Sequence, residues 1–464
     1  METLQRTANR GSVSTGYDID NSLKLEQGSN EWLYRASPTA GNRKTHTFSF
    51  WIKRSTLGNP TASGTMYVIG QGQHGRMFFS SDFFQYRFDD GHDVRDVTTK
   101  HRDPAAWLHV VVSVDTNQSS SSNRVKIFFN GVQTTTIDFD GGSYPDQEDT
   151  ASGWFTTSYL TIGTAPFGGS YNAGDGDYDM SGYLAEFVAI DGTAYAPTDF
   201  AEYSTDGIWI PKDISELTFG SEGFYLNFSN ASNLGEDFSG NDNDFASSNL
   251  AAVDQATDTP TNNFATLNPL NVNSATASNN PTISEGATYH QSTLNDHWQP
   301  SIGTIGFTAG KWYFEGKIKN SNTNHGNISF GMGDEGDIEN WGRNNDFPDA
   351  SGSKSLGYIG TDTPTFDHDD IISVAVDADN GKVYFAKNNT YINSGDPAAG
   401  SNGVSIPTGG DANGTYLFGI GGYKHNNYAE IQVNFGGYTA MTISSAASDA
   451  NGYGTFEYAP PSGY

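Results

Sequence analysis

Cysteine is absent from the 464 residues. Disulfides and thiolate metal sites are therefore excluded as sources of stability or chemistry. The first ten residues contain no apolar signal-peptide core, and no later stretch has the length of a transmembrane helix. From these absences we expect a protein that is made and folded in a reducing host cytoplasm and that does not insert into membranes.

Basic residues are scarce. The chain has 24 Lys and Arg against 54 Asp and Glu, a formal net charge of −30. Binding to nucleic acid requires clustered cationic side chains to neutralise phosphates, so we expect no nucleic-acid partner. The same charge disfavours anionic membrane surfaces and favours solubility.

Long helical patterns are also missing. Short aromatic and β-branched runs are separated by turn-forming residues, including 54 Gly and 17 Pro, and this pattern is typical of all-β proteins. The length allows more than one domain. We predict two tandem antiparallel β-sandwich (jelly-roll) domains. The expected parts are an N-terminal tail at 1–16, a first sandwich at 17–230, an extended joint at 231–284 and a second sandwich at 285–464.

The first module contains apolar strands that alternate with turns. Residues 107–115 and 124–131 form a predicted hairpin, and Asn130-Gly131 supplies the next tight turn. The order and spacing of these strands resemble laminin-G-like, concanavalin-A-like jelly rolls. The residues that carry the resemblance are Trp107-x-His109, Val125 to Gly131 and Gly182-x-Leu184-x-Glu186. This fold hosts lectins, glucanases and adhesion modules, so the resemblance implies a fold and leaves function open.

The second module carries a strong hairpin signal at Asp379-Asn380-Gly381, between alternating apolar runs. Together with two further segments it resembles a SPRY-type sandwich. The matching residues are Lys311 to Glu315, Ile372 to Asn388 and Val433 to Gly436. The resemblance implies a binding domain whose loops grip a partner at one edge.

Three further segments resemble a type of marine bacteriophage virion protein, namely Gly41 to Thr45, Asp258 to Leu270 and Phe456 to Tyr464. The resemblance implies a tail-fibre, tail-associated or capsid-surface protein whose partners are other virion proteins. We also expect a homo-oligomer.

One run resembles a catalytic motif. Glu335-Gly336-Asp337-Ile338-Glu339 has the Glu-x-Asp-x-Glu pattern of laminarinase-type glucanases, in which alternating strand residues place carboxyls on one face. The glycines around it indicate a loop, and it lies in the SPRY-like half. No nucleophile elbow or His pair at metal-ligand spacing accompanies it. We therefore expect no catalytic residues and no enzyme activity.

A calcium site is a weaker hypothesis. Asp175, Asp177 and Asp179 with Glu186 have the spacing of a calcium loop, although Met180 stands where an EF-hand needs Gly. An EF-hand is thus excluded, while a Ca²⁺ ion held by loop carboxylates in the first domain stays open. A second acidic loop contains Asp89, Asp90, Asp93 and Asp96.

Aromatic residues in loops are the preferred binding candidates, because sugars stack on ring faces that are flanked by Asn and Asp. The candidates in the first module are Trp154, Tyr171 and Tyr178, and those in the second are Trp341, Tyr391, Tyr423 and His425.

The sequence thus predicts a non-enzymatic phage structural protein that is displayed on the virion and recognises a host-surface polysaccharide. Two alternatives remain open. One is a capsid-surface or attachment protein without a ligand, and the other is a polysaccharide depolymerase.

Overall fold

A computed structural model describes residues 17–58, 64–139, 142–166, 178–270, 280–320, 328–334, 354–356, 367–406, 415–424 and 429–464. The chain divides into two compact units, Met1–Asn263 and Phe264–Tyr464. Both are built from antiparallel sheets, which confirms the predicted fold class. The helices named within these ranges are short 3₁₀ turns. None of the described helices is long and apolar enough to cross a membrane.

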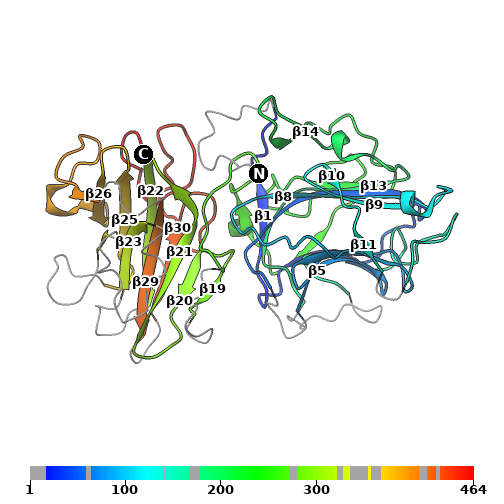
Figure 1. The fold of residues 1–464 in the computed structure, drawn as a ribbon, viewed down its shortest axis with the longest axis horizontal. Coiled ribbons are helices and arrows are strands. Elements are labelled where there is room, and N and C mark those ends of the chain that lie inside the picture. Colours follow the sequence, from blue (N-terminus) through cyan, green and yellow to red (C-terminus); the bar gives the residue numbers. More distant parts are fainter. Residues whose placement is uncertain are drawn as a thin grey trace. The chain divides into compact units, whose positions relative to one another are not determined.

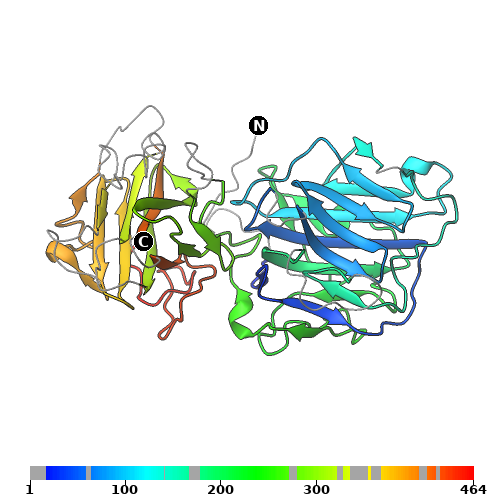
Figure 2. The same ribbon diagram turned by 90° about the horizontal axis from the view of Figure 1, so that it is seen from below.

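The first unit is a sandwich of two sheets, which Figure 1 shows as stacked layers. Figure 2 shows its strands running side by side. Sheet A has the order β10-β9-β8-β3-β13-β1-β18, with β16 also paired to β13, and sheet B has the order β11-β7-β6-β5-β4-β12-β2-β17. The strands of sheet A are β1 (Ser22–Leu25), β3 (Thr45–Arg54), β8 (Leu108–Asp115), β9 (Val125–Phe129), β10 (Val132–Gln133), β13 (Gly182–Asp191), β16 (Phe224–Leu226) and β18 (Gln255–Ala256). Those of sheet B are β2 (Trp32–Arg35), β4 (Thr65–Gln71), β5 (Gly75–Ser80), β6 (Phe83–Arg87), β7 (Asp93–Asp96), β11 (Ile137–Asp138), β12 (Leu160–Ile162) and β17 (Ala246–Ser248).

Alternation along the strands builds the core between these sheets. In β3, Phe48, Phe50 and Ile52 point inward, as every second residue of a strand lies on one face. Sheet B supplies the opposite wall through alternate residues such as Met77 and Phe79. The outer face of sheet A is covered by a smaller cluster around Phe200, next to the hairpin of β14 (Ala201–Tyr203) and β15 (Trp209–Pro211).

The expected joint at 231–284 is divided between the two units. Its first part belongs to the first sandwich, because β17 pairs with β2 and β18 pairs with β1. Its second part belongs to the second unit, where the Leu267 backbone N–H donates to the carbonyl of Ala287. The strands β17 and β18 have only three and two residues, too few for a clear apolar alternation in the sequence.

A buried polar cluster holds residues 258–263 to the first sandwich. The Lys53 Nζ lies 2.6 Å from Asp258 Oδ2 and donates to Asn263 Oδ1 at 2.8 Å. The Trp107 indole N–H donates to Asp258 Oδ1 at 2.9 Å, and the Ser22 hydroxyl donates to the Asp258 carbonyl. Residues 258–263 therefore form a structural clasp on the first sandwich.

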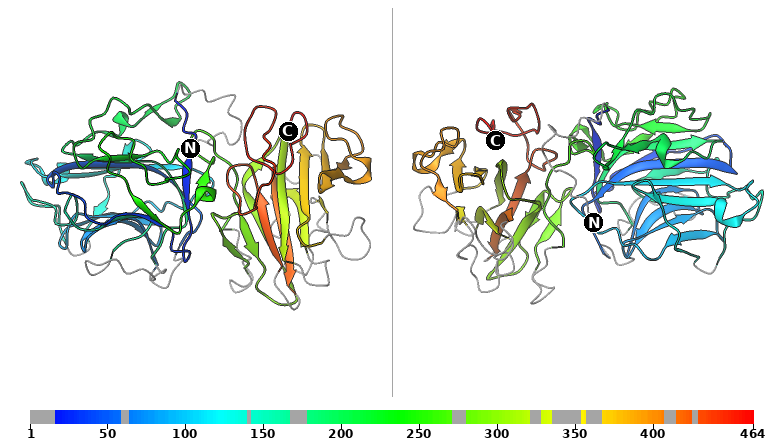
Figure 3. Two further views of the ribbon diagram at one scale, coloured as in Figure 1. Left: turned by 180° about the vertical axis from the view of Figure 1, so that it is seen from behind. Right: turned by 45° about the horizontal axis from the view of Figure 1, so that its top comes forward.

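The second unit is also a two-sheet sandwich, seen from behind in Figure 3 as yellow-green to orange strands. Sheet C has the order β19-β20-β30-β22-β25-β26-β27, with β28 also paired to β26, and sheet D has the order β21-β29-β23-β24. The strands of sheet C are β19 (Thr282–Ser284), β20 (Tyr289–Gln291), β22 (Lys311–Asn320), β25 (Ile371–Asp377), β26 (Lys382–Lys387), β27 (Thr390–Tyr391), β28 (Val404–Ser405) and β30 (Glu430–Asn434). Those of sheet D are β21 (His297–Phe307), β23 (Ile328–Asp334), β24 (Lys354–Leu356) and β29 (Tyr416–Lys424).

The Phe456–Tyr464 segment, red in Figure 1, packs on sheet C. Its anchor is Glu315, a buried carboxylate that accepts backbone N–H bonds from Glu457 and Tyr458 at 2.9 and 2.8 Å. The Phe456 ring lies edge-on against Tyr313, 5.1 Å between centroids. The Phe456–Tyr464 segment is thus part of the fold of the second unit.

Candidate functional site

One row of residues in sheet B breaks the apolar pattern of the core. Leu160 of β12 pairs with Arg35 of β2 on one side and with Gln71 of β4 on the other. Because Leu160 belongs to the core between the sheets, its two cross-strand neighbours point to the same inner face. Two polar side chains therefore occupy inward positions at the ends of their strands.

The facing row in sheet A is apolar. Ala189 of β13 pairs with Phe48 of β3 and with Phe224 of β16. The two rows bound a small cavity at one end of the sandwich, with room for about one water molecule. We name it the end cavity. Its lining residues are Arg35, Pro38, Thr39, Phe48, Gln71, Phe155, Leu160, Glu222 and Phe224.

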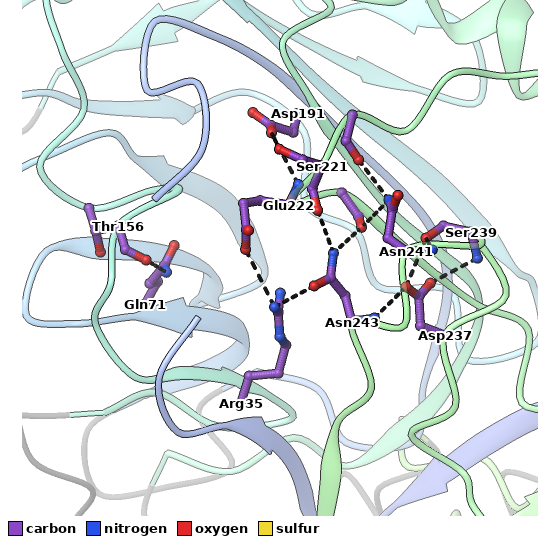
Figure 4. A network of polar contacts seen from close by, with 12 residues as sticks. Arg35, Gln71, Thr156, Asp191, Ser221, Glu222, Asp237, Ser239, Asn241 and Asn243 are labelled. Atoms are coloured by element: carbon purple, nitrogen blue, oxygen red, sulfur yellow. Dashed lines mark hydrogen bonds and ion pairs between the residues drawn. The ribbon is translucent and has the colours of Figure 1, made fainter. Parts of the chain in front are cut away.

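Arg35 occupies the polar side of the end cavity (Figure 4). Its Nη2 donates to Asn243 Oδ1 at 2.6 Å and lies 3.4 Å from Glu222 Oε2. The guanidinium also lies over the Phe245 ring, 6.0 Å from its centroid. Arg35 and Glu222 are both partly shielded, with side chains 12% and 11% exposed. In such surroundings their charges are less screened than at an open surface.

Two loops of the first unit hold Glu222 and Asn243 in place (Figure 4). Asp191 Oδ2 accepts the backbone N–H of Glu222 at 3.1 Å, and the Asn243 amide donates to the carbonyls of Ser221 and Gly223. Asp237 Oδ2 in turn accepts the backbone N–H of Asn243 at 2.9 Å. Gly223 approaches the Phe219 carbonyl so closely that a Cβ atom would overlap it.

The opposite rim is fixed by Gln71. Its amide donates to the carbonyls of Thr156 and Ser158 at 2.8 and 3.2 Å, which holds the loop that carries Phe155. Phe155 has a positive φ of 52°, an uncommon conformation for a bulky residue. Its carbonyl accepts the backbone N–H of Gly41 at 3.0 Å, so the loop is tied on both sides. Backbone strain of this kind often accompanies ligand contacts.

The end cavity combines an aromatic floor with one cation, one anion and one amide at its rim. Apolar walls beside a few fixed polar groups are typical of ligand sites. The sequence patterns did not predict this site. The signal in the sequence was a polar residue two positions after an inward-pointing apolar residue of the same strand. Arg35 follows Leu33 in this way, and Gln71 follows Ile69.

The structure contradicts the prediction that Trp154 is an exposed, sugar-binding aromatic residue. Its side chain is fully buried, stacks on Tyr86 at 5.8 Å and donates its indole N–H to the Arg87 carbonyl. Trp154 lies in a loop, as the sequence indicated, but its side chain is buried because this loop folds over the end of the sandwich. Trp154 lies behind the end cavity, in contact with Phe48 at 4.8 Å between ring centroids.

The other described candidates do not meet at one site. Tyr178 of the first unit is half-buried with its ring 5.6 Å from that of Tyr67. In the second unit, Tyr391 packs against the cluster of Tyr384 and Tyr464, and Tyr423 lies edge-on to Trp298. Tyr171, Trp341 and His425 lie outside the described residues.

The predicted calcium loop is described only in part. Asp179 is buried, and Glu186 accepts hydrogen bonds from the Tyr17 and Tyr225 hydroxyls at 3.0 and 2.6 Å. These bonds engage the carboxylate that the sequence analysis offered as a fourth calcium ligand. Asp175 and Asp177, like the Glu335, Asp337 and Glu339 motif, lie outside the described residues.

Most acids of the second acidic loop have internal partners. Asp93 lies 2.7 Å from Arg87 Nε, and Asp96 accepts the backbone N–H of Thr98. Asp89 pairs with His92 at 2.8 Å, and Asp149 approaches the same ring nitrogen at 3.9 Å. In the described part of the chain these last three residues offer two oxygens and a nitrogen within 4.8 Å of one another, a set of donors that a transition metal could use.

Comparisons with known proteins give no family. No family model and no curated protein match the chain. The SPRY domain of human HERC1 matches at 15% identity over 33% of this chain and 91% of that chain, with a TM-score of 0.24. A SAP-like pentraxin from Limulus polyphemus matches at 14% identity over 39% and 80%, with a TM-score of 0.26. The NHR domain of Neuralized from Drosophila melanogaster matches at 16% identity over 37% and 90%, with a TM-score of 0.25. At these TM-scores and identities the similarities carry no conclusion about the function of this chain.

Proposed function

We propose that this chain is a non-enzymatic, glycan-binding protein displayed on the surface of a phage particle, of the tail-fibre or tail-associated type. The observation that carries the binding part is the end cavity, where Phe48, Phe155 and Phe224 lie below a rim of Arg35 and Glu222. Aromatic surfaces beside fixed polar groups are typical of sugar sites.

The polar groups of the end cavity favour binding over catalysis. The carboxylate of Glu222 lies 3.4 Å from Nη2 of Arg35, so the two side chains form an ion pair. Glycoside hydrolysis needs a second carboxyl flanking the scissile bond, and among the described residues that line the end cavity Glu222 is the only carboxylate.

The virion part of the proposal rests on the resemblance of three segments to marine phage virion proteins. Two of them are bound within their own units, one to the first sandwich through Asp258 and the other to the second sandwich through Glu315. Because these segments help to hold the two folds, a resemblance in them indicates this pair of domains. It does not indicate which ligand the protein binds.

A glycan array probed with the purified chain tests the binding function. We expect binding to at least one host-surface polysaccharide, reduced at least tenfold by Arg35→Ala and unchanged by Lys212→Ala, since Lys212 is a partly exposed cation outside the end cavity. An array without any bound glycan would contradict the proposal.

Two further measurements address the alternatives. Immunogold labelling of intact particles should place the chain at the tail, and labelling over the capsid alone would favour a capsid-surface protein. Release of reducing sugars that disappears in Glu335→Gln would show a depolymerase instead.

A further inference from the structure

We infer that Asp89, His92 and Asp149 form a binding site for a divalent transition metal ion, with Zn²⁺ as the representative. Asp89 and His92 belong to the turn between β6 and β7, and Asp149 lies in the segment between β11 and β12. We call these three residues the donor triad. They are not part of the lining of the end cavity, and the inference does not depend on the proposed glycan binding.

The donor triad converges on one ring nitrogen. His92 Nδ1 lies 2.8 Å from Asp89 Oδ1 and 3.9 Å from Asp149 Oδ2, and one donor atom from each residue lies within 4.8 Å of the other two. Zinc bonds of about 2.0–2.2 Å place neighbouring ligands of a tetrahedral site roughly 3.3–3.6 Å apart. The two separations lie on either side of this spacing, so small side-chain adjustments bring all three donors to bonding distance of one ion.

A hydrogen bond alone does not account for the second carboxylate. A histidine ring nitrogen carries at most one hydrogen, and Asp89 at 2.8 Å is placed to accept it from Nδ1. Asp149 is left 3.9 Å from the same nitrogen, which is too far for a hydrogen bond. A metal ion on Nδ1 would replace that hydrogen and attract both carboxylates at once.

The charges of the donor triad point to the same conclusion. Among the described residues, the ion-pair partner of both Asp89 and Asp149 is His92, and neither carboxylate pairs with a lysine or arginine. The neighbouring Asp93, by contrast, is paired with Arg87 at 2.7 Å. Two carboxylates that face one imidazole are left with an excess of negative charge, which a divalent cation would neutralise.

The local backbone holds the donors in place. Asp149 Oδ1 accepts the backbone N–H of Thr150 at 2.7 Å, which leaves Oδ2 on the side of His92. The Phe88 backbone N–H donates to the His92 carbonyl at 2.9 Å and closes the turn that carries Asp89. Because the fold already gathers the three side chains, little ordering is needed when an ion binds.

The ligand types favour zinc and related ions over Ca²⁺ and Mg²⁺, which prefer all-oxygen sites. Three protein ligands leave the fourth tetrahedral position to water. The side chains of His92, Asp89 and Asp149 are 22%, 16% and 29% exposed, so an ion can enter from solution. The two segments already touch, since a Cβ atom at Gly142 would overlap the Gly91 carbonyl oxygen. A bound ion would therefore cross-link two loops of the first unit.

Titration calorimetry with zinc chloride on the full chain, after treatment with a chelator, tests this inference. We expect one Zn²⁺ per chain in the tightest class of sites, with Ca²⁺ and Mg²⁺ binding at least a hundredfold more weakly. X-ray absorption at the zinc edge should show oxygen ligands and a single imidazole. Because the ion binds the folded state, zinc should also raise the melting temperature of the first unit.

Two variants and a matched control locate the ion. His92→Ala removes the ring nitrogen, and Asp149→Asn keeps the shape of the side chain while it removes the charge. The control is His368→Ala in the second unit, since His368 lies 3.6 Å from a single carboxylate, that of Asp369. We expect each of the first two variants to weaken zinc binding at least tenfold and the control to leave it unchanged. Circular dichroism checks that all three fold, and Asp149→Asn decides if His92→Ala does not.

Three results would overturn the assignment. Zinc binding that either folded variant leaves unchanged would place the ion elsewhere on the chain. Calcium binding as tight as zinc binding would contradict a nitrogen ligand. Absence of zinc binding at millimolar concentration would leave Asp89 and His92 as an ordinary hydrogen-bonded pair.

Discussion

Glu186 combines burial, an unusual backbone conformation and a carboxyl group in one residue of the first sandwich. It has a positive φ of 49° and lies where the register between β13 and β3 shifts, so a β-bulge turns its side chain toward Tyr17 and Tyr225. Burial raises the pKa of Glu186 from 4.5 to about 7, while the two tyrosine hydroxyls act in the opposite direction. The folded protein therefore holds this proton more tightly than the unfolded chain.

The stability of the first unit should consequently depend on the protonation of Glu186. Between pH 4.5 and about 7 the folded state binds more protons at this group, so its contribution to stability is lost as pH rises through that window. The difference between the two pKa values corresponds to about 3 kcal/mol. We expect Glu186→Gln to be more stable than the natural protein at pH 8, by up to this amount, and equal to it near pH 4.5.

Chemical denaturation of both proteins at several pH values measures this difference directly. Other titrating groups, such as the buried His46 and His109, are the same in both proteins, so their contributions cancel in the difference. Burial lowers the pKa values of these two histidines to about 3. A difference in unfolding free energy that does not change with pH would contradict the assignment to Glu186.

At the scale of elements, the clasp around Asp258 joins β1, β3 and Trp107, which directly precedes β8, to the 258–263 segment. Asp258→Asn keeps the shape of the side chain but leaves the Lys53 ammonium buried beside a neutral group. Breaking a buried ion pair in this way costs about 3–5 kcal/mol, and we expect a loss of that size in the unfolding free energy. Adding Lys53→Met to Asp258→Asn should recover most of it, and a double variant no better than the single one would argue against the pair.

The Phe456–Tyr464 segment has a comparable anchor in Glu315. This carboxylate accepts four hydrogen bonds, from Tyr313, Asn434 and two backbone N–H groups. Glu315→Gln replaces one acceptor oxygen with an N–H₂ donor. We expect faster hydrogen exchange in residues 455–464 and a destabilisation of about 1–3 kcal/mol, with Glu202→Gln, on the exposed surface, as an unaffected control.

Sequence patterns predicted the strands well where the strands are long and apolar residues recur at every second position. The predicted hairpin strands at 107–115 and 124–131 coincide closely with β8 and β9, and the Asn-Gly turns lie where the hairpins reverse. The end cavity was not predicted, because it arises from cross-strand pairs such as Leu160 with Arg35, which lie far apart in the chain. Trp154 was assigned to a loop surface for the same reason, since local sequence carries no information on what folds over a loop.

At the scale of the whole molecule, each unit has its own hydrophobic core and its own polar anchor. Separate cores favour separate cooperative unfolding. We expect two transitions in differential scanning calorimetry. Asp258→Asn should lower the melting temperature of one transition and Glu315→Gln that of the other, whereas a single transition shifted by both variants would contradict independent units.

The walls of the end cavity have a consequence for detecting its ligand. Phe48, Leu160 and Phe224 belong to the core of the first sandwich, so the site disappears when that sandwich unfolds. By thermodynamic linkage, a ligand at a hundred times its Kd would stabilise the folded state by about 2.7 kcal/mol. Occupancy would thus raise the melting temperature of one half of the chain and leave the other half as an internal reference, so that a thermal scan alone could screen unlabelled glycans.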